Sequence, residues 1–267
     1  MQAADYWKKL DNIVDDSILW NIPEQKTGRI AVIGGNLENC MVEIKNTEFL
    51  NSLPIKSANL LLPSALQGKL PAFASVYFAD STSSGSFAKS STLENFALDS
   101  DLVFFSGDFS KNSITEIAII DTLRKLHENQ LIVVTRDACD LISADIQGIL
   151  ERKNLILMAS LVQLQKIFRA ALYPKMILLS MPIFSIIEIL HKFTLSYPCT
   201  ILTFHQNQII LASAGTVYTI PINQTNYTPL TLWSGTLACK ISTLALWNPT
   251  NLLNAAECAI FWDHRKN

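Results

Sequence analysis

Apolar residues follow two alternating patterns along the chain. Short, largely apolar runs predict strands that are buried on both faces, as in a covered parallel sheet. These runs lie at 29–33, 101–106, 131–135 and 154–158. Between them apolar positions recur at helical spacing, as in Ile119, Leu123 and Leu126. Strands that alternate with helices are typical of an α/β domain with a mostly parallel sheet.

The rest of the pattern predicts further elements. Apolar positions in residues 4–14 have helical spacing, which predicts a short N-terminal helix. Ser113, with Glu116 three residues later, matches a capping box at a helix start. The serine-rich stretch 81–91 predicts a solvated surface loop or a flap. Other predicted strands lie at 58–62, 75–78, 200–204, 208–213 and 216–221, and another helix lies near 184–193.

The most informative stretch is 229–247, where a polar turn opens an apolar helix. One face of that helix consists of Leu237, Ile241, Leu244 and Trp247. Ser234 or Thr236 can cap it, and Gly235 lets a ligand approach the backbone closely. The first N–H groups of a helix have no partner within it, so this start can bind a phosphate. An ordinary capped core helix is the alternative.

Composition narrows the classes of function. The 267 residues fit one α/β domain with a large core, since 49% are hydrophobic and only 16% are charged. A formal charge of −2 without a long basic run argues against a nucleic-acid partner. Five scattered cysteines predict reduced, buried thiols in a cytoplasmic protein. No signal peptide and no membrane-spanning apolar segment is seen, so no membrane partner is expected.

Several short motifs together resemble one known family. Gly28-Arg29 follows Lys26, the first strand runs into Val32-Ile33-Gly34-Gly35-Asn36, and Asp137 follows the strand at 131–135. With the turn at 231–236, this order resembles the ATP/ADP-dependent NAD(P)H-hydrate dehydratases of the ribokinase-like superfamily, with the chain as a degenerate member.

The resemblance extends from Lys26 to about Arg265. It implies a ribokinase-like three-layer α/β/α fold with a mostly parallel central sheet, formed by residues 1–267 as a single domain. Residues 1–25 would form an N-terminal helix and lead-in, and residues 229–267 the anion-turn helix and a C-terminal helix starting at Asn251.

The resemblance also implies a site at the carboxyl ends of the strands. The residues expected to bind substrate are Gly34, Gly35, Asn36, Gly107 and Asp137. Those expected to bind nucleotide or phosphate are Ser234, Gly235, Thr236 and His205. Thr236 also holds the position of the family's catalytic aspartate. The alternatives are a tight turn at 34–36, a helix N-cap role for Asp137, and an exposed or core-satisfied His205.

The chain departs from the family at this site. Threonine cannot accept a proton near neutral pH as the family's aspartate does, and Leu232 and Trp233 stand where the family has two glycines. Asp108 adds a negative charge that repels a phosphate by about 1 kcal/mol or more at contact distance. The helix expected at 37–50 is polar, whereas the family's helix is rich in alanine and glycine.

Three functions remain open from the sequence. The first is an NAD(P)H-hydrate dehydratase, a lyase that uses ATP or ADP to repair hydrated NAD(P)H, weakened or inactive because of Thr236. The second is a catalytically silent pseudoenzyme that acts as a binding or assembly subunit, and the third is a small-molecule kinase. The expected partners are NAD(P)H hydrate or a nucleotide, and further copies of the chain in a homo-oligomer. The cofactor would be ATP or ADP with Mg²⁺, or none, and the four histidines show no metal-ligand spacing.

Overall fold

One sheet of ten strands runs through the computed structural model, which describes residues 5–20, 27–70 and 75–262. The strands are β1 Trp7–Lys9, β2 Thr27–Gly34, β3 Ile55–Pro63, β4 Val76–Ala79, β5 Leu102–Gly107, β6 Leu131–Thr135, β7 Leu155–Met158, β8 Thr200–His205, β9 Gln208–Ser213 and β10 Thr216–Pro221. Seven neighbouring strands are parallel, in the order β4-β3-β2-β5-β6-β7-β8. Strand β9 is antiparallel to β8 and β10, and β1 pairs in parallel with β10.

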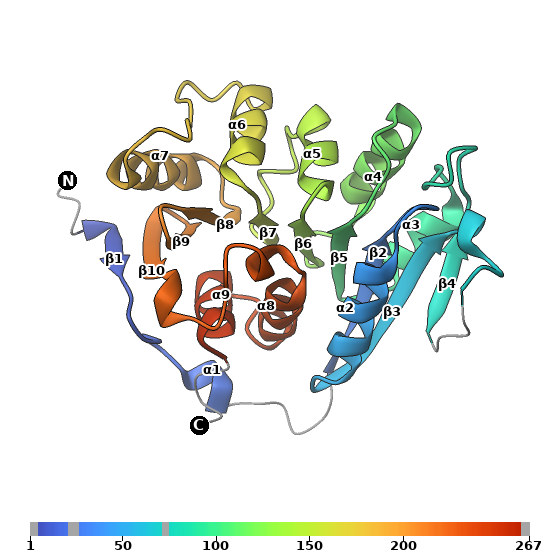
Figure 1. Ribbon diagram of the computed structural model, residues 1–267, viewed down its shortest axis with the longest axis horizontal. Helices are drawn as coiled ribbons and strands as arrows, with labels where there is room; N and C mark the ends of the chain where they lie inside the picture. Colours follow the sequence, from blue (N-terminus) through green and yellow to red (C-terminus); the bar gives the residue numbers. More distant parts are fainter. Residues whose placement is uncertain (1–4, 21–26, 71–74, 263–267) are drawn as a thin grey trace.

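Helices cover both faces of this sheet, so the molecule has three layers (Figure 1). One layer consists of α3 Ser91–Leu98, α4 Ser113–Lys125, α5 Ala138–Ile142, α6 Leu161–Ala170 and α7 Ile183–Ser196. The other consists of α1 Ser17–Trp20, α2 Met41–Asn51, α8 Thr236–Trp247 and α9 Leu252–Phe261. This arrangement confirms the predicted three-layer α/β/α fold with a mostly parallel sheet.

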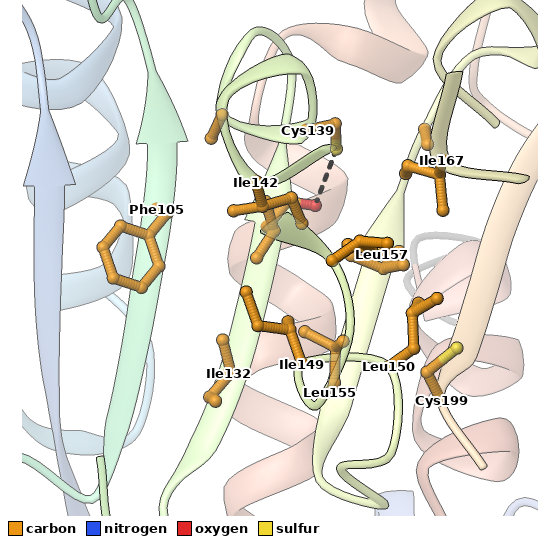
Figure 2. Packing of buried hydrophobic residues seen from close by; sticks show 14 of the residues in the cluster. Phe105, Ile132, Cys139, Ile142, Ile149, Leu150, Leu155, Leu157, Ile167 and Cys199 are labelled. Atoms are coloured by element: carbon orange, nitrogen blue, oxygen red, sulfur yellow. Dashed lines mark hydrogen bonds between the residues drawn. The ribbon is translucent and has the colours of Figure 1, made fainter. Parts of the chain in front are cut away.

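Each face of the sheet has its own hydrophobic core, because successive side chains of a strand point to opposite faces. On β5, Phe105 enters the core under α3 to α7, and its neighbour Phe104 enters the core under α2, α8 and α9. Figure 2 shows part of the first core, where Phe105 and Leu157 lie near Ile142 and Ile167 of the covering helices. Burial on both faces explains why the strands have continuous apolar sequences.

The N-terminal segment differs from its prediction. Residues 7–9 form strand β1 instead of part of a helix, and the Trp7 indole donates a hydrogen bond of 2.9 Å to Thr219 Oγ1. This difference arises from tertiary structure. Without β1, strand β10 would be an unpaired edge of the sheet, and pairing with β1 satisfies the backbone groups of β10. Residue 4, where the predicted helix began, lies outside the described residues.

Several predicted boundaries also change. Helix α4 is capped by Asn112, whose side chain accepts a hydrogen bond from the Thr115 N–H, so Ser113 is not the cap. The stretch 81–91 is only partly solvated, because Ser83, Ser84 and Lys89 are exposed whereas Phe87 is fully buried and pairs with Ser81 in an isolated β-bridge. The predicted C-terminal helix is observed as α9, while Lys26 and residues 263–265 lie outside the described residues.

The strand order reverses its direction between β2 and β5. From β2 the chain passes to β3 and β4 on one side, and it returns through β5 on the other side. In open α/β sheets, ligands commonly bind at the carboxyl ends of the two strands from which the connections diverge in this way. Gly34 and Gly107 end these strands and pair directly with each other.

Candidate functional site

The residues expected to bind substrate come together at the carboxyl ends of β2, β5 and β6. The N–H of Gly35 donates to the carbonyl of Gly107 at 2.9 Å, and the Asn36 side-chain amide donates to the carbonyl of Asp108 at 2.8 Å. The N–H of Asp108 in turn donates to Asp137 Oδ1 at 2.7 Å. The loops after three neighbouring strands therefore form one hydrogen-bonded cluster.

Gly34 and Gly107 have no room for a side chain. A Cβ atom on Gly34 would lie 2.5 Å from the Gly107 carbonyl oxygen and 2.6 Å from Ser106 Oγ. A Cβ atom on Gly107, whose φ is +107°, would lie 2.7 Å from Asp137 Oδ1. The close approach of β2 and β5 therefore requires glycine at both positions, whether or not a ligand binds.

Asn36 and Asp137 also shape the loops that carry them. Asn36 Oδ1 accepts hydrogen bonds from the N–H groups of Glu38 and Asn39 at 2.7 and 3.0 Å, which fixes the turn after β2. Asp137 stands at the N-cap position of α5, yet its side chain caps no helical N–H. Its carboxylate accepts from the Asp108 N–H instead, so Asp137 holds the N-cap position without capping the helix through its side chain.

A charged network lies beside this cluster. The Arg136 guanidinium lies 3.4 Å from Glu43 Oε1 and forms a close ion pair with Asp108. Ser106 Oγ donates to the same Glu43 oxygen at 3.0 Å. Asp108 and Arg136 both have a φ of +55°, a left-handed conformation that is uncommon outside glycine. Two neighbouring strands thus end in left-handed residues that bind each other, and such strain clusters at functional sites.

Burial raises the pKa values of two acids here, Glu43 and Asp137. Burial, together with the nearby charge of Asp108, raises the pKa of Glu43 to about 8, although Arg136 and the Ser106 hydroxyl act in the opposite direction. Burial also raises the pKa of Asp137, against the hydrogen bond from the Asp108 N–H. Glu43 Oε2 has no hydrogen-bond partner among the described residues. Glu43 is therefore mostly neutral near pH 7, and the charge of Asp108 is offset by its ion pair with Arg136.

The turn at 231–236 opens α8 without a side-chain cap. Thr231–Trp233 forms a short 3-10 helix, Gly235 is the N-cap with a φ of +99°, and Thr236 is the first helical residue. The Ser234 hydroxyl donates to the Thr231 carbonyl at 2.8 Å. Capping by Ser234 or Thr236 is therefore not observed.

The side chain of Asn46, from α2, fills the space beside Gly235. A Cβ atom on Gly235 would lie 2.2 Å from Asn46 Nδ2 and 2.4 Å from Oδ1, and its three nearest atoms all belong to Asn46. Asn46 is buried, and the Cys239 thiol of α8 donates to the backbone carbonyl oxygen of Asn46 at 3.6 Å. Leu232, at one of the family's glycine positions, is buried in the core instead. The side chain that occupies the space beside Gly235 therefore comes from α2.

The structure separates His205 from this turn. His205 Nε2 hydrogen-bonds the carbonyl oxygen of Met181, which precedes α7, at 2.8 Å. Helices α7 and α8 cover opposite faces of the sheet. The position of His205 therefore agrees with the alternative of a core-satisfied histidine.

Other kinds of site find no support in the described part of the chain. It contains no group of three or more histidine, cysteine or acidic residues placed to hold a metal ion. None of its helices has the length and apolar character needed to cross a membrane. All five cysteines are buried and unpaired, as their scattered spacing predicted.

Solved structures with the same fold match nearly the whole chain at low sequence identity. A ribokinase-like superfamily protein from Enterococcus faecalis V583 is 15% identical, with a TM-score of 0.69 over 98% of this chain and 89% of its own. The ADP/ATP-dependent NAD(P)H-hydrate dehydratase from Bacillus subtilis, crystallised with ATP and Mg²⁺, is 14% identical, with a TM-score of 0.57 over 95% and 90%. Phosphomethylpyrimidine kinase from Clostridium difficile 630 is 10% identical, with a TM-score of 0.52 over 88% and 99%.

No protein-family model and no curated protein matches the sequence. The fold is ribokinase-like, and identities this low establish the fold alone. Function must therefore be argued from the site.

Glu43, Asn46 and Arg136 are site residues that the motifs did not indicate. The signal for the first two was the polar sequence of 37–50, where the resembled family has alanine and glycine. A motif comparison detects the lost loop residues, but it does not show which side chains occupy the space they leave. Arg136 lies between strand β6 and Asp137, and that position was its only signal.

Proposed function

We propose that this ribokinase-like chain is a catalytically silent relative of the NAD(P)H-hydrate dehydratases that serves as a binding or assembly subunit. The observation that carries the proposal is the Asn46 side chain beside Gly235. In the resembled family a phosphate meets bare backbone at this turn. Here a phosphate approaching Gly235 would have to displace a buried side chain of α2.

The chemistry at position 236 supports the same conclusion. A general base typically contributes ~10²–10⁴ to a rate, and a threonine hydroxyl cannot act as one near neutral pH. The one cation of the neighbouring network, Arg136, is already paired with Asp108 and Glu43. Among the described residues, position 236 therefore lacks a base, and the network beside it lacks a cation that is not already paired.

The opposite wall of the site favours a retained binding role. Gly34, Gly35, Asn36, Gly107 and Asp137 still meet where the strand order reverses. The carboxyl oxygens of Asp108 and Asp137 favour a ligand that carries hydrogen-bond donors. A weakened dehydratase and a small-molecule kinase both need the nucleotide site, so one set of experiments tests all three functions.

Nucleotide binding is the first test. Thermal unfolding of the wild type should be unchanged by millimolar ATP or ADP with Mg²⁺, because only a ligand that binds the native state raises Tm. The double variant Asn46→Ala/Thr236→Asp removes the obstruction and restores the acid, so its Tm should rise with nucleotide. Lys45→Ala with Thr236→Asp is the matched control, because Lys45 is an exposed neighbour on the same helix.

Turnover of hydrated NADPH with ATP or ADP is the second test. We expect none from the wild type and measurable turnover from Asn46→Ala/Thr236→Asp if the substrate wall is intact. Turnover by the wild type, or a nucleotide-dependent rise in its Tm, would contradict the proposal and favour a dehydratase.

A further inference from the structure

The connection between α6 and α7 exposes several large apolar side chains. In residues 171–182, Leu172, Met176 and Leu179 are 80%, 57% and 65% exposed. Leu178 and, in the first turn of α7, Phe184 are 41% and 62% exposed. Figure 1 shows this connection running from the outer end of α6 to α7 at the periphery of the molecule. Single exposed apolar residues are normal, but several gathered in one segment mark an interaction site. We call these five residues the apolar patch.

The segment that carries the patch is anchored to the body of the protein. Ile177, in its middle, is only 1% exposed, and the Met181 N–H donates to the Leu178 carbonyl at 3.1 Å. Tyr173 packs edge-on against Phe168 and Phe193 of the adjacent helices. The apolar side chains are therefore displayed by a structured loop.

Two hollows of about 280 Å³ each flank the ridge formed by Lys175 and Met176. Phe168 and Tyr173 line one hollow, and Met181 and Ile189 line the other. Covering these walls would remove further apolar surface from water.

Positive charge borders the part of the patch that Leu172 and Met176 form, because these two residues share the hollows with the cations. Arg169, Lys175 and Lys192 line the hollows, and Glu188 is the only acid among the lining residues. Lys192 pairs with Glu188 at 2.5 Å, whereas neither Arg169 nor Lys175 forms an ion pair with any described residue. The border is thus cationic on a chain whose formal charge is −2.

This charge decides between possible occupants. A second copy docked patch to patch would bring the same cations face to face, which is unfavourable. The complementary surface is apolar where it meets the leucines and anionic at its border. A bilayer with anionic headgroups has both properties, and it accepts exposed apolar side chains without a matching groove.

We infer that the apolar patch docks the protein reversibly on membranes that contain anionic phospholipid. Leu178 and Leu179 enter the acyl-chain boundary, and Arg169 and Lys175 pair with headgroup phosphates. This inference revises the sequence-based expectation of no membrane partner.

Co-sedimentation with phosphatidylcholine vesicles, with and without phosphatidylglycerol, tests the inference. The wild type should sediment with the anionic vesicles only. Added salt should release it, because salt screens the attraction between the protein's cations and the anionic headgroups. Leu178→Asp/Leu179→Asp and Arg169→Glu/Lys175→Glu should each lower the bound fraction by about tenfold or more. Ile114→Asp/Ile117→Asp, at two exposed positions of α4, is the matched control and should bind like the wild type.

Circular dichroism and thermal unfolding identify the variants that remain folded. The inference is overturned if the wild type ignores anionic vesicles, or if folded patch variants bind them as well as the wild type does. Light scattering provides a further test. A wild-type dimer that Leu178→Asp/Leu179→Asp dissociates would show that a second copy covers the patch. Capture of an acidic protein without any vesicle binding would likewise assign the patch to a protein partner.

Discussion

At the scale of single residues, Glu43 is a buried acid whose charged form is disfavoured by its surroundings. The side chain is 0% exposed, and its Oε1 receives the Ser106 hydroxyl and lies near Arg136. Burying an ionised carboxylate costs more free energy than burying the neutral acid. Burial therefore raises the pKa of Glu43 from 4.5 to about 8, with Asp108 adding to the effect.

We predict that Glu43 makes the protein less stable as pH rises from about 5 to 8. In this window the folded chain keeps a proton that the unfolded chain has released. The free energy of unfolding therefore falls with pH by up to about 1.4 kcal/mol per unit, and it levels off above the folded-state pKa. Urea unfolding across this window should show a flatter slope for Glu43→Gln than for the wild type.

The matched control for this prediction is Glu48→Gln, at an exposed position of the same helix, which should keep the wild-type slope. An unchanged slope in Glu43→Gln would mean that the Glu43 carboxyl is ionised in the folded protein.

At the scale of elements, one side chain decides where α4 begins. Asn112 Oδ1 accepts the Thr115 N–H at 2.8 Å, and Ser113 is already helical. Asn112→Ala should lower the free energy of unfolding by about 1 kcal/mol, and Ser113→Ala should leave it nearly unchanged. Asn112→Asp keeps the acceptor and should retain most of the stability. Urea unfolding of the three variants measures this, and a larger loss for Ser113→Ala would restore the capping box that the sequence predicted.

Helix α2 shows how one element can change a site without changing the fold. It is the crossover helix that the strand order needs between β2 and β3, and it begins at Met41, later than the expected start at residue 37. Its polar residues Glu43 and Asn46 face the interior and fill space beside Gly34 and Gly235. The site is therefore altered by the helix that packs on it as well as by its own loops.

At the scale of the whole molecule, the two cores share the same strands. Phe104 and Phe105 are adjacent on β5 and enter opposite cores. Phe104→Ala and Phe105→Ala should each cost about 3–5 kcal/mol. Each should also shift the circular dichroism and tryptophan fluorescence transitions together, since neither layer keeps its core without the sheet.

Trp233, Trp247 and Trp262 pack on the α8–α9 side, so fluorescence mainly reports that layer. Ile114→Ala, at an exposed position of α4, is the control for both probes. A Phe105→Ala variant whose circular dichroism midpoint shifts while its fluorescence midpoint does not would show that the layers unfold separately.

Much of the fold was determined by the sequence itself. Strands β2, β5, β6 and β7 are buried on both faces, and that burial demands continuous apolar sequence which is visible without a structure. The same holds for the meeting of Gly34, Gly107 and Asp137, because parallel strands bring their carboxyl ends to one edge of the sheet. At these residues the local sequence pattern and the position in the fold indicate the same structure.

Only the tertiary structure decided the remaining features. Strand β1 forms because β10 offers an edge, His205 bonds Met181 on the face opposite α8, and Asn46 lies beside a glycine 189 positions later in the chain. Each of these depends on a partner far away in sequence, and periodicity reports only which face of an element is apolar. What a polar side chain meets on the buried face is set by the packing of layers.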